Sequence, residues 1–267
     1  MAELADVLSD LEAEGADLER IVTGLDAEGW RTPTPAEGWT IAHQIGHLAW
    51  TDDIATVSAA QPDVFYTRVQ EALGSGAVET YVDRAAQEWA AKDELLDVWR
   101  GARAGLAEAL KNVPAGTKLN WFGPPMSAMS MATARLMETW AHGQDVYDAL
   151  GVEHPVTDRI KHVAHLGVRT RNFAYMMRGE TAPATEFRVE LGAPSGGRWT
   201  WGPEDAADRL TGSALDFCLL VTQRRHRLDT DLQASTDAVE HWLSIAQVFA
   251  GPSGEGRRPG QFSGDAA

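Results

Sequence analysis

METWAHGQDVYDALG, residues 137–151, carries the most informative pattern in the chain. Apolar spacing around it predicts one long helix over 127–150. Within that helix Glu138 and His142 are four residues apart, and Asp145 follows three residues later. At about 100° per residue these three side chains share a narrow sector. The ExxxH spacing lets two ligands reach one metal ion from adjacent turns.

The charged sector has two interpretations. The opposite side of the helix carries an apolar stripe of Leu136, Trp140, Gly143, Tyr147 and Leu150, so the charged sector could simply face water. Against this, apolar residues also lie above and below the trio in its own sector, namely Met131, Ala134 and Ala149. This favours burial, and a buried carboxylate needs a partner or a metal.

A second predicted helix supplies a matching face. It runs from residue 41 to about residue 59, with Thr40 as its N-cap. One sector of it holds His43, His47, Trp50 and Ile54. A lone imidazole among apolar neighbours is usually a hydrogen-bonded core residue. Ligands on a second helix that faces His47 would change this interpretation. His47 with Glu138 and His142 makes a His2Glu set, which is the number of protein ligands in catalytic zinc sites that keep one position open.

Two alternatives stay open within this site. HxxxH on one helix is also a chelating spacing, so His43 competes with His47. Asp145 could instead accept a hydrogen bond from an imidazole N–H. The donor set favours zinc but tolerates nickel or iron as the divalent metal.

The other apolar patterns complete a helical bundle. Helices are predicted over residues 3–25, 92–111 and 158–177, in addition to the two already described. Long helices joined by loops of varied length are typical of a bundle. We therefore expect a mainly α fold, with a metal-binding four-helix bundle in a first domain of residues 1–180.

The pattern changes after Gly179. EFRVEL and RWTWG alternate apolar and polar residues around the turn signal APSGG, which predicts a hairpin. Helices are expected over 206–224 and 236–249, so residues 181–250 form a small α+β domain. The tail, 251–267, has almost no apolar residues and is expected to be disordered.

The overall charge excludes two classes of partner. There are 23 Lys and Arg against 39 Asp and Glu, a formal net charge of −16, which repels phosphate backbones and anionic lipids. We therefore expect neither nucleic-acid nor membrane partners. The start of the chain lacks the pattern of a signal peptide and no long apolar run occurs, which predicts a soluble cytoplasmic protein. The single cysteine, Cys218, lies in the apolar run ALDFCLLV and is expected in the core.

At the candidate ligands the chain resembles the DinB-like metalloprotein superfamily, and more closely its mycothiol-dependent maleylpyruvate isomerase group. The resemblance lies in EGWTIAHQIGHLAW at 37–50 and METWAHGQDVYDALG at 137–151. It implies that His47, Glu138 and His142 bind the metal, and so selects His47 over His43. It covers roughly the first 150 residues.

The same resemblance carries implications for the second domain and for function. Members of the group often carry a C-terminal domain similar to a sterol-carrier protein, in which a helix ends in Gly-Arg and the Arg helps to bind substrate or thiol. Here Gln223 stands at the Gly position and Arg224 at the Arg position. Arg224 is therefore a candidate catalytic residue, although a solvated cation at a helix end explains it equally well.

The implied activity is that of a mycothiol-dependent isomerase or S-transferase acting on a small electrophilic substrate, with mycothiol as cosubstrate. Two other classes fit the sequence. One is a metal- or small-ligand-binding protein without turnover, and the other is a metal-assisted hydrolase that activates water at the open position. Dependence of turnover on a thiol separates the three.

Overall fold

A computed structural model describes residues 3–74, 81–249, 251, 254 and 256–262 of the chain. The chain divides into two compact units, which are residues 1–155 and residues 156–267. We refer to them as unit 1 and unit 2 and describe each by itself.

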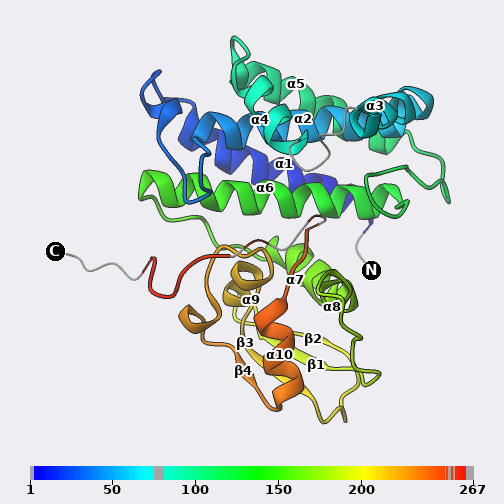
Figure 1. The fold of residues 1–267 in the computed structure, drawn as a ribbon, viewed down its shortest axis with the longest axis vertical. Coiled ribbons are helices and arrows are strands. Elements are labelled where there is room, and N and C mark those ends of the chain that lie inside the picture. The colour runs from blue at the N-terminus through cyan, green and yellow to red at the C-terminus, as the bar shows by residue number, and fades with distance from the viewer. Residues whose placement is uncertain (1–2, 75–80, 250, 252–253, 255, 263–267) are drawn as a thin grey trace. The chain divides into compact units, whose positions relative to one another are not determined.

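Unit 1 is built around the four predicted bundle helices. They are α1 (Leu4–Val22), α2 (Ile41–Ala60), α5 (Leu95–Lys111) and α6 (Ala128–Leu150). Helix α2 packs against α5 and α6, and α1 packs against α6 and α5 (Figure 1). A short 3-10 turn, η1 (Gly29–Arg31), lies between α1 and α2. The expected four-helix arrangement is confirmed.

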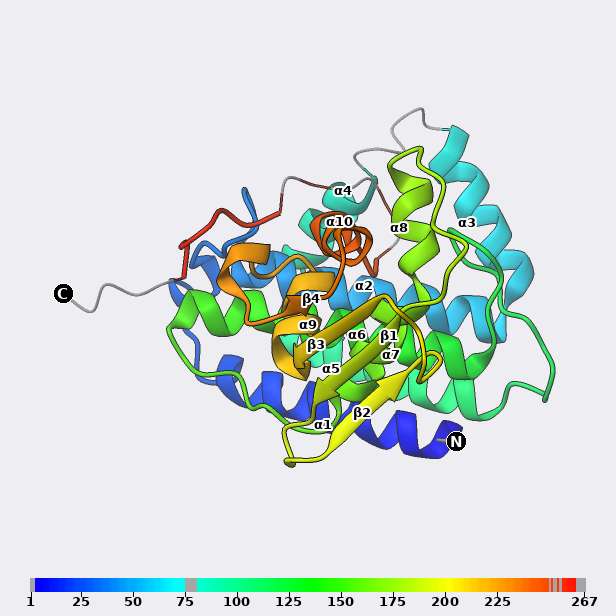
Figure 2. The ribbon, with the colours of Figure 1, turned by 90° about the horizontal axis from the view of Figure 1, so that it is seen from below.

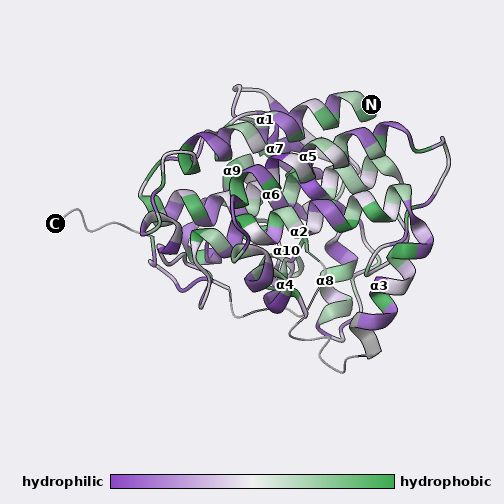
Figure 3. Cartoon of the chain, turned by 90° about the horizontal axis from the view of Figure 1, so that it is seen from above, coloured by the Kyte–Doolittle hydropathy of each residue, from purple (hydrophilic) through white to green (hydrophobic). Residues whose placement is uncertain are grey.

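Local chemistry sets the ends of the helices that carry the site. The Ser127 hydroxyl accepts a hydrogen bond from the Ser130 N–H and caps α6, close to the predicted start of this helix. Gly151 ends α6 in the left-handed conformation, at φ 62°. Thr40 has extended backbone and precedes the first turn of α2. Along α1, hydrophobic and hydrophilic residues alternate in bands (Figure 3), as expected of a helix that packs on one side.

The interior of unit 1 lies where α1, α2, α5 and α6 meet. Its buried core residues are Leu18, Val22, Ile41, Ile45, Leu48, Ala49, Leu95, Trp99 and Val146. Both the apolar stripe of α6 and its opposite sector are buried in large part, since Met131, Trp140 and Asp145 are at most 1% exposed. The interpretation of the charged sector as a wet face is therefore wrong.

Unit 1 contains two further helices that were not predicted from the sequence, α3 (Pro62–Gly74) and α4 (Tyr81–Ala90). The buried residues of α4 are Ala85 and Ala86, which give no strong apolar signal. Helix α4 is instead held by close packing on α2 at Gly46. A Cβ at Gly46 would lie 2.6 Å from the Ala90 backbone nitrogen, so only glycine allows this approach.

Unit 2 combines helices with a four-stranded sheet. Its helices are α7 (Ile160–Arg169), α8 (Arg171–Met177), α9 (Ala214–Val221) and α10 (Asp237–Ile245), with the 3-10 turn η3 (Arg227–Asp229). The strands are β1 (Arg188–Gly192), β2 (Arg198–Trp201), β3 (Arg209–Ser213) and β4 (Gln233–Ala234). Their order in the sheet is β2-β1-β3-β4. Figure 2 shows the sheet in front of α7 and α9, and α9 packs on β1 and β3.

The predicted hairpin is confirmed, because β1 and β2 pair antiparallel with Val189 opposite Trp201. The predicted helix over 206–224 is wrong in its first part, where β3 pairs parallel to β1 and only the end is helical, as α9. Parallel pairing with a distant strand overrode the local pattern. The predicted helix over 158–177 is divided at Thr170, whose backbone leaves the helical region at ψ 7°. Thr236 caps α10 near the predicted start of the last helix.

These elements confirm a mainly α protein with an N-terminal helical bundle and a small α+β part. The compact units meet at residues 155 and 156, whereas the domain boundaries proposed at 180 and 250 stay predictions. The predicted disorder of the tail falls in part on residues 252–253, 255 and 263–267, which lie outside the described residues. Among the helices that the structure describes, none is both long and apolar enough to cross a membrane.

Candidate metal centre

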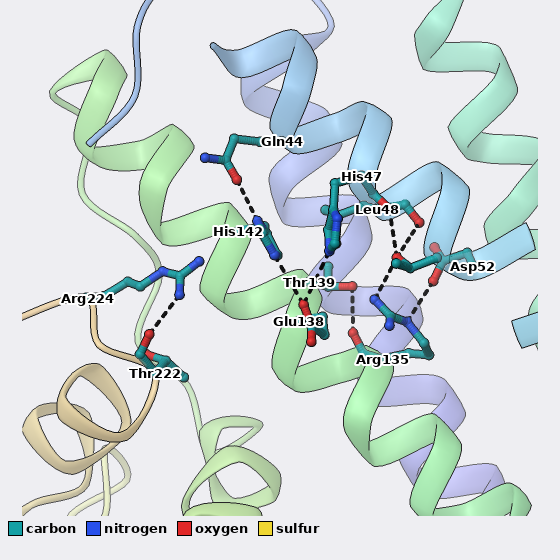
Figure 4. Close-up of polar contacts among 11 residues, drawn as sticks. Gln44, His47, Leu48, Asp52, Arg135, Glu138, Thr139, His142, Thr222 and Arg224 are labelled. Atoms are coloured by element: carbon teal, nitrogen blue, oxygen red, sulfur yellow. Dashed lines mark hydrogen bonds and ion pairs between the residues drawn. The ribbon is translucent and has the colours of Figure 1, made fainter. Parts of the chain in front are cut away.

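The three predicted ligands come together inside unit 1. One ligand atom from each of His47, Glu138 and His142 lies within 4.8 Å of the others. Glu138 Oε2 is 3.1 Å from His142 Nε2 and 3.5 Å from His47 Nε2 (Figure 4). His47 projects from α2, whereas Glu138 and His142 occupy successive turns of α6. The packing of these two helices therefore assembles a His2Glu cluster.

Gln44 orients one of the two imidazoles. Its Oε1 lies 2.5 Å from His142 Nδ1 (Figure 4). Its Nε2 donates a hydrogen bond to Thr34 Oγ1 at 2.9 Å. The second contact directs the amide oxygen toward the ring, so His142 Nδ1 donates and carries a proton. In the neutral imidazole His142 Nε2 then carries a lone pair instead of a proton. That lone pair faces a carboxylate oxygen, an arrangement that requires a cation or a proton between the two atoms.

The charge of Glu138 suits a cation at this point. Burial by itself raises the pKa of its carboxyl group, but hydrogen bonds with His142 and His47 and the nearby charge of Arg135 outweigh burial. The pKa of Glu138 is therefore held well below its ordinary value, and the group is ionised at neutral pH. Two imidazole nitrogens and one carboxylate oxygen are a donor set that divalent zinc accepts. The residues present thus fit a metal ion.

Aromatic rings enclose the cluster. The Trp39 ring stacks on His142, with centroids 5.9 Å apart, and lies 5.5 Å from the His47 ring. Its indole N–H donates to Asp83 Oδ1 at 3.2 Å, which ties Trp39 to α4. The Trp50 ring also contacts His47, at a centroid distance of 5.9 Å. These rings reduce contact of the imidazoles with water.

A buried ion pair lies beside the cluster and was not found from the sequence. Arg135, one turn before Glu138, donates to Asp52 Oδ1 at 3.2 Å and to Thr51 Oγ1 at 2.8 Å (Figure 4). Arg135 and Asp52 are 2% and 1% exposed. Burial raises the pKa of Asp52 to about 6, although the charge and hydrogen bond of Arg135 lower it. A charged residue in the buried sector of each helix was the signal that could have revealed this pair.

The structure distinguishes His43 and Asp145, the two alternatives left open by the sequence, from the three predicted ligands. His43 Nδ1 lies 2.8 Å from Thr40 Oγ1 and accepts a hydrogen bond from the Thr40 N–H, so His43 serves the start of α2 rather than the cluster. Asp145 is fully buried on α6. Its role as an acceptor for an imidazole N–H stays a prediction.

Arg224 belongs to unit 2, directly after α9. Gln223 before it adopts the left-handed conformation, at φ 59°. The Arg224 N–H donates to the Leu219 carbonyl and the Gln223 N–H to the Leu220 carbonyl, which is the Schellman ending of a helix. The Arg224 side chain donates to the Thr222 carbonyl oxygen at 2.7 Å (Figure 4). The left-handed turn suits the glycine implied by the resemblance, and the catalytic role of Arg224 stays a prediction.

Fold and cluster together define a helical-bundle protein with a candidate His2Glu centre and an additional α+β unit. Comparison with known families makes the class specific, since the profile of the mycothiol maleylpyruvate isomerase N-terminal domain matches residues 11–147. The chain belongs to this family. The profile of a second family, described as wyosine base formation, matches residues 183–234 of unit 2.

Individual proteins resemble the chain over nearly its whole length. Two proteins of Mycobacterium tuberculosis, from strains CDC 1551 / Oshkosh and ATCC 25618 / H37Rv, are each 54% identical over 259 residues. Each match covers 96% of this chain and 100% of the relative, and both relatives are described as uncharacterized proteins.

Two solved structures share the fold. The crystal structure of a mycothiol-dependent maleylpyruvate isomerase matches with a TM-score of 0.60 and 16% identity, over 88% of this chain and 93% of that one. A mutant of that enzyme, with a histidine replaced by alanine, matches with a TM-score of 0.56 and 14% identity, over 82% and 88% of the two chains.

Proposed function

We propose that this protein is a metal-dependent enzyme that uses a low-molecular-weight thiol, mycothiol, to isomerise a small electrophilic substrate or to transfer the thiol onto it. The observation that carries the proposal is the His2Glu cluster of His47, Glu138 and His142. The family and the mycothiol-dependent isomerases that share its fold support the choice of thiol chemistry. The donor set favours zinc. We place the enzyme in the cytoplasm.

The chain's own cysteine is poorly suited to be the nucleophile. Cys218 is fully buried in α9, its thiol lies 3.4 Å from the Ile160 carbonyl oxygen, and burial raises the pKa of the thiol. A thiol with a raised pKa forms little of the reactive thiolate. An exogenous thiol therefore fits the chemistry better than a protein thiol.

Each residue of the proposed site has a defined task. His47, Glu138 and His142 would hold the metal, Gln44 keeps the His142 ring oriented, and Trp39 covers the imidazoles. A bound divalent cation would supply positive charge that favours the deprotonated form of a coordinating thiol. In this proposal Arg224 would pair with a carboxylate of the substrate.

The isomerase reaction balances without any further reactant. The thiolate sulfur forms a C–S bond to one carbon of the substrate's electron-poor double bond, and the π electron pair moves onto the electron-withdrawing group at the other carbon, so that the bond becomes single and can rotate. Return of this electron pair then breaks the C–S bond, restores the double bond in the other geometry and releases the thiolate. In a transferase the other carbon would instead take up the proton lost by the thiol, and the C–S bond would persist in the product.

Metal content tests the ligand assignment. We expect His142→Ala to lose most bound metal in elemental analysis while its circular dichroism stays close to wild type, because two ligands cannot replace three. His43→Ala is the matched control, since His43 contacts Thr40 outside the cluster, and it should keep its metal. Full metal content in His142→Ala would exclude the assignment. Glu138→Gln should weaken metal affinity, because an amide supplies no ligand charge.

Thiol dependence tests the reaction class. In a cobalt-substituted sample, mycothiol should produce a sulfur-to-metal charge-transfer band, and turnover of a small electrophile should require the thiol. If neither the band nor thiol-dependent turnover is observed while metal is bound, the protein is a metal-binding protein without this activity. Turnover that needs metal but no thiol would instead identify a hydrolase.

A further inference from the structure

Arg135 carries a positive charge beside the proposed metal centre without being one of its ligands. It precedes Glu138 by three residues on α6, a spacing at which arginine and a carboxylate can pair along a helix. Its guanidinium group is instead turned to α2, where Nε donates to Asp52 Oδ1 at 3.2 Å and Nη2 donates to Thr51 Oγ1 at 2.8 Å (Figure 4). The opposite helix therefore holds this arginine.

Burial makes the choice of partner important. Arg135 is almost fully buried, and a guanidinium group that is cut off from water without an anion is strongly unfavourable. Thr51 offers a neutral oxygen, whose own hydroxyl donates to the His47 carbonyl oxygen at 2.8 Å. Asp52, which is also buried, contributes a carboxylate. Asp52 therefore supplies the negative charge that keeps Arg135 on α2.

Two polar contacts between α2 and α6 flank the ligands. One precedes His47 along α2, where Gln44 meets His142, and the other follows it, where Asp52 meets Arg135. The first contact orients a ligand ring directly. The second contact joins two residues that are not ligands, so its effect on the centre depends on where it places the arginine.

The position of Arg135 matters to Glu138. Burial raises the pKa of the Glu138 carboxyl group, whereas hydrogen bonds with His142 and His47 and the charge of Arg135 lower it. The arginine is thus close enough to act on this carboxylate. A guanidinium group that turned to Glu138 would bind the carboxylate oxygens in pairs, and those oxygens would be lost to a metal. Without compensation its charge would also repel a divalent cation.

We propose that Asp52 is a positioning residue of the metal centre, because it holds the Arg135 guanidinium group on α2 and so keeps the Glu138 carboxylate available to the metal. This inference rests on the proposed metal site of His47, Glu138 and His142. Asp52 then affects metal affinity through Arg135 rather than through contact with the ion.

Zinc affinity of the full-length protein tests this role, measured by competition with a chromophoric chelator. At about pH 7.5 Asp52 is mostly ionised, since burial raises its pKa to about 6. Asp52→Asn should bind zinc roughly 10- to 100-fold more weakly than wild type, the usual effect of changing a residue that supports a metal ligand. Arg135→Gln should keep the wild-type affinity, because it removes the side chain that Asp52 restrains. Combining the two substitutions should recover most of the affinity lost in Asp52→Asn.

Cobalt absorption distinguishes this role from a simple loss of stability. In cobalt-loaded Asp52→Asn the visible bands should move toward those of Glu138→Gln, because in both variants the carboxylate is withdrawn from the metal. A destabilised protein with an unchanged site would keep the wild-type bands, and that result would overturn the inference. Circular dichroism and urea titration establish that each variant is folded under the assay conditions.

Asp53→Asn is the matched control. Asp53 is next in the chain, but its side chain is 39% exposed and pairs with Arg68. This variant removes the same charge and should keep the wild-type zinc affinity. Equal weakening in Asp52→Asn and Asp53→Asn would reduce the effect to overall charge and contradict the proposed role.

The remaining outcomes separate this inference from the proposed function. Equal weakening in Asp52→Asn and Arg135→Gln would make the pair a mere cross-link between helices and overturn the inference, as would unchanged affinity in Asp52→Asn. If Asp52→Asn does not fold, Arg135→Gln decides, because lost affinity there contradicts a role that works by restraining Arg135 and retained affinity supports it. Wild-type protein that binds no metal would refute the metal site itself, and this inference with it.

Discussion

Replacement of Asp52 by asparagine should change how stability depends on pH. Asp52 is 1% exposed beside Arg135, and burial raises the pKa of its carboxyl group from 3.8 to about 6. The folded protein therefore holds this proton more tightly than the unfolded chain does. Consequently the free energy of unfolding loses stabilisation as the pH rises through this window, and regains it on acidification.

The magnitude follows from the two pKa values. A difference of about 2 pKa units at about 1.4 kcal/mol each corresponds to roughly 3 kcal/mol in total. About 2 kcal/mol of this falls between pH 4.5 and pH 7.5, since part of the change is complete below pH 4.5. Asp52→Asn cannot titrate, so its stability relative to wild type should rise by about 2 kcal/mol across that range.

Urea denaturation of metal-free protein at several pH values measures this difference. Asp53→Asn is the control, because Asp53 is next in the chain but its side chain is 39% exposed and pairs with Arg68. It should follow the wild-type dependence. Parallel stability curves for wild type and Asp52→Asn from pH 4.5 to pH 7.5 would refute the reasoning.

Three further predictions concern single positions. Gln223→Gly should raise the free energy of unfolding by about 1 kcal/mol in urea titrations, because Gln223 is left-handed, whereas Gln223→Ala should give no such gain. Gly46→Ala should lower the unfolding free energy by about 1–3 kcal/mol or more, since its Cβ would lie 2.6 Å from the Ala90 backbone nitrogen; an unchanged melting temperature would contradict this. Cys218 should resist thiol reagents in the native protein and react after unfolding, and rapid native labelling would show that it is accessible.

Much of unit 1 could be predicted because its signals are local. The period of apolar residues, the Ser127 cap and the Gly151 stop lie within a few residues of the elements they define. The spacing of Glu138 and His142 is also a property of one helix, so their common face follows from helical geometry. Placing His47 opposite them required the resemblance to a family, since periodicity did not choose between His47 and His43.

The contacts that complete the site were beyond such reasoning. Gln44 and His142 are 98 residues apart in the chain, and Asp52 and Arg135 are 83 apart. Whether a buried polar side chain finds a partner depends on which helices become neighbours, and no local pattern encodes that. The same reason explains why α4 was missed, because its place depends on contact with Gly46 rather than on its own apolar residues.

Unit 2 shows the same division between local and distant information. The β1–β2 hairpin was predictable because its turn and both strands are contiguous in the sequence. Strand β3 also pairs directly with β1, but β2 lies between the two in the sequence. Sequence periodicity therefore established most of the helices, the hairpin and the Glu138/His142 pair. Packing between distant segments established the parallel pairing and the orientation of the ligands, because these depend on contacts that exist only after the chain has folded.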